Sequence, residues 1–191
     1  MRFFLLTAAA VFWLEAAQIC TWRVKNVEIG WEAFKTPLKI GVKGGFGTVK
    51  LSAKPDESID GLLEGARVIV ETESIDSDNR ARDAKLVKSF FRIQGVQTVT
   101  AQIVRVLDDI VEVEITMNGQ TRTVPMRLTR GEERVEAVGV LDLADFRMLP
   151  SLTALNEACK EPHQNKTWQD VKISFTLDLT QKCKEGIERR P

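Results

Sequence analysis

The chain has 191 residues, of which 43% are hydrophobic, and this length suits one domain with a substantial buried core. Lys plus Arg and Asp plus Glu number 27 each, so the formal net charge is zero and there is no overall positive charge to attract nucleic acid or an anionic membrane. This balance predicts no nucleic-acid partner and favours a small or neutral ligand.

The N-terminal segment is typical of a signal peptide. Met1-Arg2 gives a short positive start, and residues 3–14 form a largely apolar run that is too short to cross a hydrocarbon core of ~30 Å as a helix. Small residues follow at Ala16 and Ala17, and cleavage after either is expected. We therefore expect a signal peptide over residues 1–17, one mature domain over residues 18–191, no stable membrane span, and a periplasmic or secreted location.

Alternation of apolar and polar residues predicts that the mature domain is mainly β. The run from Val171 to Leu179 alternates most clearly, and Asn118-Gly119 between two alternating runs is a strong hairpin signal. Eight strands are expected, over residues 22–29, 38–53, 65–74, 98–106, 111–117, 121–128, 135–143 and 171–179. Eight antiparallel strands close a small barrel that either holds one elongated ligand or is filled by its own side chains.

Two segments interrupt the strand pattern and predict short helices. Residues 77–90 carry helix-forming Arg, Lys and Ala, with Asp76 or Ser77 as the N-cap. Residues 150–160 begin with Pro150, which suits the first turn of a helix. The expected architecture is therefore a β-barrel with two or three short helices.

The cysteines fit an exported barrel. Cys20 precedes the first expected strand and Cys183 follows the last, and these two strands pair antiparallel in a closed barrel with an even strand count. We therefore expect a Cys20–Cys183 disulfide, with Cys159–Cys183 as the alternative. Lipoprotein processing at Cys20 is a further alternative, which would need a small residue in place of Ile19. His163, the sole histidine, is placed in a polar loop, and no metal site is expected.

Family resemblance covers most of residues 22–179. A strand from Ala66 to Thr72 leads into Ser74-Ile75, then into a helix with Arg82-Asp83, and then into Phe90-Phe91. This order resembles the YceI family of periplasmic, lipocalin-like barrels that carry isoprenoid lipids. Further segments resemble the family's opening strand, glycine-then-Phe strand, hairpin and closing portion, namely Trp22-Arg23-Val24, Lys43-Gly44-Gly45-Phe46, residues 115–124, Asp145-Phe146 and residues 170–173.

The resemblance implies an eight-stranded antiparallel lipocalin-like barrel that carries a long-chain lipid: an isoprenoid, a quinone precursor or a fatty-acid derivative. No other cofactor is implied. Each CH₂ that such a lipid removes from water contributes about 0.8 kcal/mol, so a long tail needs few polar contacts. The apolar residues that we expect to line the lipid tunnel, each of which could instead be plain core packing, are Trp31, Phe34, Val42, Phe46, Val70, Phe91, Ile103, Ile115, Met126, Phe146, Ile173 and Phe175.

Two cations are candidates for contact with a polar headgroup. Lys35 lies beside Trp31 and Phe34, and a solvated lysine is its alternative reading. Arg82 lies in the expected helix beside Asp83, where a helix-capping ion-pair cluster is the alternative.

The sequence carries no enzyme motif. It has no Gly-x-Ser-x-Gly elbow, no phosphate-binding glycine loop and no dinucleotide fingerprint, and a single histidine disfavours a Ser-His-Asp triad. We therefore expect a carrier and not an enzyme. The alternative is a protein-interaction or stress-related module with a filled barrel, which would present a loop over residues 29–37 to a partner. Two copies could form a homodimer through open barrel mouths, but no residue requires it.

Overall fold

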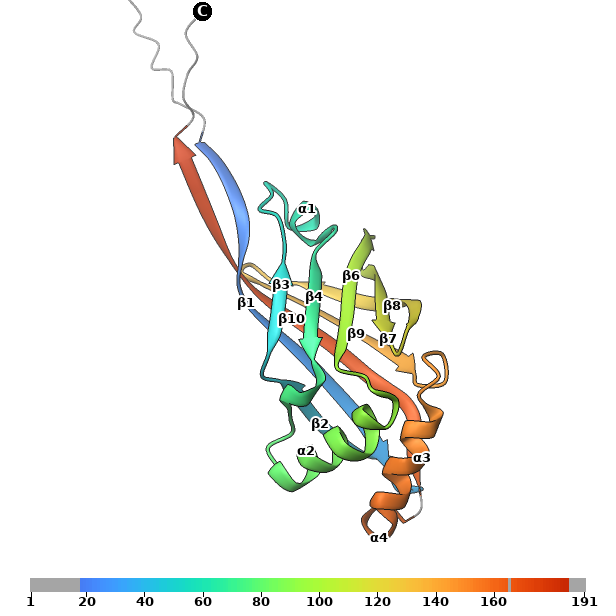
Figure 1. Ribbon diagram of the computed structural model, residues 1–191. Coiled ribbons are helices and arrows are strands. Elements are labelled where there is room, and N and C mark those ends of the chain that lie inside the picture. The colour runs from blue at the N-terminus through green and yellow to red at the C-terminus, as the bar shows by residue number, and fades with distance from the viewer. Residues whose placement is uncertain (1–17, 165, 186–191) are drawn as a thin grey trace, which may run out of the picture.

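The computed structural model describes residues 18–164 and 166–185 (Figure 1). The signal peptide expected over residues 1–17 lies outside the described residues. Ten strands of the described chain form one antiparallel sheet, in the order β3-β4-β6-β7-β8-β9-β10-β1-β2-β5. The strands are β1 (Gln18–Lys35), β2 (Ile40–Phe46), β3 (Val49–Ser52), β4 (Arg67–Glu71), β5 (Ile75–Asp76), β6 (Thr98–Val106), β7 (Ile110–Met117), β8 (Gln120–Arg130), β9 (Arg134–Asp142) and β10 (Thr167–Glu185).

The expected count of eight strands is wrong, because one expected strand is divided in two and a short additional strand, β5, follows another. Residues 38–53 form β2, which pairs with β1, and β3, which pairs with β4, since the chain changes neighbour at Gly47. Residues 65–74 end as a strand at Glu71, where a short 3-10 helix (Thr72–Ser74) turns the chain into β5. β5 then pairs with β2.

Near Gly47, backbone contacts bring the two edges of the curled sheet together. Phe46 of β2 pairs with Ile75 of β5, and the Gly47 amide donates to the Ser74 carbonyl at 2.8 Å. Beyond this point the Glu71 amide donates to the Thr48 carbonyl at 3.2 Å. The segment from β2 to β3 therefore runs from one edge region of the sheet to the other, and the sheet curls around an enclosed interior.

β1 and β10 form the longest ladder. It runs from Gln18 opposite Glu185 to Lys35 opposite Thr167, well beyond the expected residues 22–29 and 171–179. The end of this ladder nearest the termini projects past the rest of the sheet (Figure 1). There Cys20 and Cys183 are direct cross-strand partners joined by a disulfide, so the expected pairing is confirmed. Cys159 is free and buried, which excludes the Cys159–Cys183 alternative.

The helices gather mainly at the opposite end of the sheet, where α2, α3 and α4 lie together (Figure 1). α2 continues into a wider turn over Val87–Phe91 and a 3-10 turn over Arg92–Gln94. Its N-cap is Asn79, whose side chain accepts a hydrogen bond from the Arg82 amide at 3.0 Å, and not Asp76 or Ser77 as expected. The sequence reading missed α1 and α4. The helices are α1 (Ile59–Leu63), α2 (Arg80–Leu86), α3 (Leu149–Ala158) and α4 (Lys160–His163).

Candidate functional site: an apolar cavity inside the curled sheet

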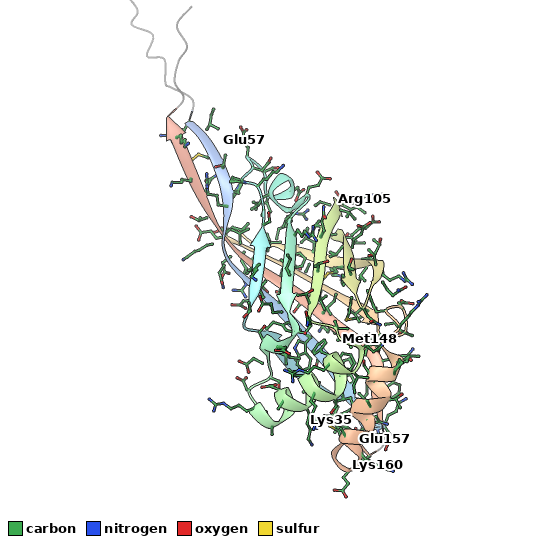
Figure 2. All side chains as sticks on the ribbon, viewed as in Figure 1. Lys35, Glu57, Arg105, Met148, Glu157 and Lys160 are labelled. Atoms are coloured by element: carbon green, nitrogen blue, oxygen red, sulfur yellow. A yellow bond between two sulfur atoms is a disulfide. The ribbon has the colours of Figure 1, made fainter. Side chains whose placement is uncertain are left out.

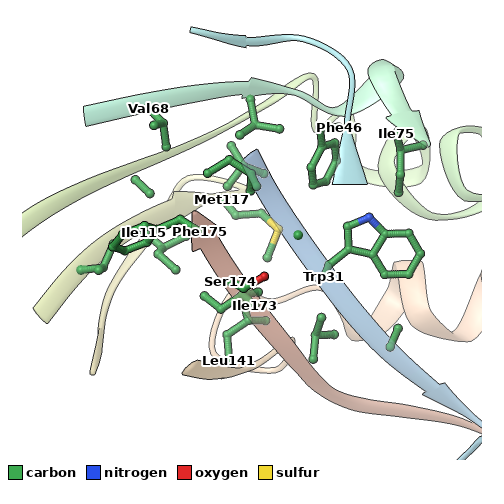
Figure 3. Close-up of a pocket in the computed structure, with 18 of the residues that line it drawn as sticks. Trp31, Phe46, Val68, Ile75, Ile115, Met117, Leu141, Ile173, Ser174 and Phe175 are labelled. Atoms are coloured by element: carbon green, nitrogen blue, oxygen red, sulfur yellow. The ribbon is translucent and has the colours of Figure 1, made fainter. Parts of the chain in front are cut away.

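An apolar cavity of about 210 Å³ lies inside the curl of the sheet (Figure 3). The barrel is therefore not filled by its own side chains, which the sequence pattern had left open. An apolar cavity of about 150 Å³ is enough to bind benzene and stays dry. The cavity can therefore accept hydrocarbon larger than a single aromatic ring.

The β1–β10 ladder forms one wall. Paired residues on antiparallel strands point to the same face of a sheet, and every second pair faces the interior. Trp31 of β1 is opposite Ile173 of β10, and Ile29 is opposite Phe175. Continuing this alternation, the ladder places four pairs at the cavity: Val27 with Leu177, Ile29 with Phe175, Trp31 with Ile173, and Ala33 with Val171.

Strands β4, β6 and β7 supply a second wall by the same rule. Ala101 of β6 lies between Val68 of β4 and Ile115 of β7, and all three line the cavity. The neighbouring inward row joins Ile103 to Val113. On each of these strands apolar residues recur at every second position, and the pairing places those positions opposite one another. The face that lines the cavity is therefore apolar.

Trp31 fits against the sheet because β2 has a glycine opposite it. Trp31 pairs with Gly44, and a Cβ on Gly44 would lie 2.5 Å from Cζ2 of the indole. The indole Nε1 donates to the Gly45 carbonyl at 3.3 Å. Gly44 therefore makes room for the Trp31 ring in the cavity wall by allowing a close approach.

Most of the expected tunnel residues do line this cavity. Their binding of a lipid remains a prediction. They are Trp31, Phe46, Val70, Phe91, Ile103, Ile115, Met126, Ile173 and Phe175.

Three expected tunnel residues lie elsewhere. Phe34 is out of phase with Trp31 on β1, and the Lys39 ammonium lies 5.1 Å from the centre of its ring. Phe34 and Val42 border a smaller cavity instead. Phe146, in the turn after β9, is only 1% exposed and packs in the core, and its carbonyl accepts a hydrogen bond from the Asn118 side chain at 3.1 Å.

Other lining residues were missed by the sequence reading. Val27, Val68 and Ala101 could have been found by extending the alternation from Trp31, Val70 and Ile103 along their strands. Leu152 and Leu155 of α3 could not, since only tertiary packing brings α3 to the cavity. The loop expected over residues 29–37 is part of β1 as far as Lys35, so Trp31 faces the interior and is not displayed to a partner.

A smaller cavity of about 60 Å³ adjoins the larger one. Both are bordered by Trp31, Ala33, Leu86, Leu155 and Thr167. Lys35 and Arg82, the two expected headgroup contacts, both border the smaller cavity, together with Lys85 and His163. Figure 2 shows Lys35 at the end of the sheet where α3 and α4 lie.

Arg82 is held by hydrogen bonds to Ser77. Its Nε donates to Ser77 Oγ at 2.8 Å, and its Nη2 donates to the Ser77 carbonyl. Asp83 accepts hydrogen bonds from the amide and hydroxyl of Ser77. Within the described residues no ion pair joins Arg82 and Asp83, so the ion-pair cluster given as the alternative is replaced by hydrogen bonds through Ser77.

His163 is not the solvated loop residue that the sequence suggested. It ends α4, is half-buried, and its Nδ1 lies 2.8 Å from Thr167 Oγ1. Burial lowers the pKa of His163, and the positive charges of Lys35 and Lys85 lower it further. Lys35 and Lys85 therefore lie near enough to His163 to disfavour its protonated form.

The chemistry offered by the larger cavity is burial. Among the described residues that line it, none is ionisable. Within residues 18–164 and 166–185, no three His, Cys, Asp or Glu side chains are grouped so as to hold a metal ion. No helix in the described part of the chain has the length and apolar character needed to cross a membrane.

Comparison with known proteins agrees with this architecture. The model of the YceI-like domain matches residues 23–179. The chain belongs to the YceI-like domain family. No curated protein matches the chain.

Solved YceI-like structures share the fold at low sequence identity. A polyisoprenoid binding domain from Saccharophagus degradans is 11% identical, with a TM-score of 0.59 over 87% of this chain and 100% of that one. BcnA from Burkholderia cenocepacia is 15% identical, with a TM-score of 0.54 over 81% and 96%. YceI protein from Campylobacter jejuni is 14% identical, with a TM-score of 0.50 over 76% and 86%. The mainly β, lipocalin-like architecture is therefore shared.

Proposed function

We propose that this YceI-like protein is an exported carrier that holds one amphiphile with a long apolar tail inside the curled sheet. The observation that carries the proposal is the larger cavity, which has about 210 Å³ of space and a lining without ionisable side chains among the described residues. An apolar cavity of this kind favours a hydrocarbon over water or a polar metabolite.

Burial alone is sufficient for useful affinity. About ten methylene groups taken out of water contribute about 8 kcal/mol, and a gain of that size corresponds to micromolar binding before the costs of association. Selection then follows the shape of the tail, since the walls built by Trp31, Ile173 and Phe175 offer contact area and few polar groups.

The relatives support a lipid of the isoprenoid type. The solved neighbour from Saccharophagus degradans is described as a polyisoprenoid binding domain, and it shares this fold. An isoprenoid, a quinone precursor or a fatty-acid derivative would each supply the apolar tail that the cavity can bury.

Two features support the export part of the proposal. Residues 1–17 have the composition of a signal peptide. The Cys20–Cys183 disulfide is of a kind that persists in oxidising compartments such as the periplasm. We propose a periplasmic or secreted location on these grounds.

The proposal is tested by extracting the purified mature protein with organic solvent and identifying the released compounds by mass spectrometry. A long-chain lipid in about equimolar amount supports the carrier. An extract without lipid, from protein that also fails to take up added long-chain lipids, contradicts it.

A further inference from the structure

The smaller cavity continues the larger one toward the helical end of the sheet. Its walls share Trp31, Ala33 and Leu86 with the larger cavity, and also Leu155 and Thr167. An elongated ligand whose tail lies among the apolar residues would therefore place its polar end among the residues that border the smaller cavity alone.

Phe34, Val42 and Cys159 are the apolar members of that set, and every charged member is a cation. Lys35 comes from the end of β1, Arg82 and Lys85 from α2, and His163 from α4. Among the described residues that border this cavity, none is Asp or Glu. In a chain with 27 basic and 27 acidic residues, this local excess is not a consequence of overall composition.

Lys35 and Lys85 are available to a ligand. Neither takes part in an ion pair within the described part of the chain. Lys35 is half-buried, so its charge is only partly solvated by water. Their shared effect in lowering the pKa of His163 places both lysines within electrostatic range of one imidazole.

Arg82, which also borders the smaller cavity, has a guanidinium whose position is fixed by Ser77. Its hydrogen bonds to Ser77 use one donor on Nε and one on Nη2, which leaves the Nη1 donors for another partner. Asp83, the nearest carboxylate along the helix, is bonded to Ser77 and does not border the cavity. A planar guanidinium held in this way suits the oxygens of a phosphate or carboxylate.

We propose that the cationic side chains bordering the smaller cavity bind an anionic headgroup, a phosphate or carboxylate, at the end of the lipid tail that the cavities bury. This inference rests on the proposed carrier function and adds the chemical class of its ligand. Lys35, Lys85 and Arg82 supply the positive charges, and His163 gains a proton when an anion sits beside it. A neutral lipid alcohol would leave these cations unpaired.

The test compares two probes with the same tail, farnesyl phosphate and farnesol, by titration calorimetry on the mature protein. The wild type should bind farnesyl phosphate about tenfold or more tightly than farnesol. A Lys35→Gln, Lys85→Gln double variant should lose this preference and keep its affinity for farnesol. Lys88→Gln is the matched control, because Lys88 is exposed on the helical segment that follows α2 and does not border the cavity.

The outcomes separate the two proposals. Equal affinity of the wild type for both probes, or a preference that survives the double variant, overturns the headgroup site and leaves the carrier function standing. Failure of both probes to bind contradicts the carrier function itself. Binding of inorganic phosphate alone as tightly as farnesyl phosphate would show a site for free anions and overturn the assignment to a lipid headgroup.

Discussion

Trp31 of β1 lies directly opposite Ile173 of β10, and both side chains line the larger cavity. At this pair the β1–β10 ladder, the longest in the sheet, forms part of the cavity wall. On the other side of Trp31, β2 contributes Gly44, which has no side chain, so the indole can pack closely against β2. The predictions below follow from this arrangement.

Gly44→Ala should destabilise the protein, by about 1–3 kcal/mol, because a Cβ there would lie 2.5 Å from both the Asp76 carbonyl oxygen and the Trp31 ring. The backbone oxygen cannot move aside without disturbing the β2–β5 pairing. Gly41→Ala is the control, since its Cβ would meet only the flexible end of Glu32. Urea unfolding measures both variants, and equal midpoints would contradict the close packing of Trp31 on Gly44.

Cys20→Ser should release Cys183, so that thiol titration of the denatured mature protein finds two free thiols where the wild type has Cys159 alone. The disulfide joins residues that are 163 positions apart, and its loss should cost about 2–5 kcal/mol of stability. Lipid binding of the folded variant should be unchanged, because the bond lies on the projecting end of the β1–β10 ladder. A thiol count that stays at one would reject the pairing.

Protonation of His163 should destabilise the ligand-free protein in mild acid. Its folded pKa lies below the ordinary value of 6.5, because of burial and the charges of Lys35 and Lys85, so the unfolded chain takes up the proton first. The stability that depends on neutral His163 is complete above about pH 6.5 and is lost as the pH falls through the folded pKa. Urea midpoints measured from pH 7.5 down to 5 should fall more steeply for the wild type than for His163→Gln. Parallel profiles would contradict this environment for the imidazole.

Much of the sheet could be predicted from alternation. Residues 98–106 form β6 as expected, and Asn118-Gly119 makes the turn between β7 and β8. The change of neighbour at Gly47 could not be predicted, because it depends on which strands lie on either side of one continuous run. β1 was expected to end at Ile29, since Gly30 and the mixed residues after it resemble a loop, whereas pairing with both β2 and β10 keeps them extended.

Only some residues of the candidate site could be predicted from the sequence. Ile103, Ile115 and Phe175 were accessible to sequence reasoning, because the alternation that marks a strand's buried face also marks its cavity face. Lys85 and His163 were not, because they meet Lys35 only through the packing of α2 and α4 beside the end of β1. Sequence alternation therefore predicts the strand residues that line the larger cavity, whereas tertiary packing brings together the cations that border the smaller one.

The carrier account is tested most directly by filling the cavity. Ala101 lies between Val68 and Ile115 and lines the cavity, whereas its neighbour Gln102 is exposed on the outer face. Binding of diphenylhexatriene, an uncharged apolar fluorescent probe, should weaken by about tenfold or more in Ala101→Trp, which corresponds to about 1.4 kcal/mol. Gln102→Trp should bind the probe as the wild type does. Equal binding by all three folded proteins would contradict a ligand inside the curled sheet.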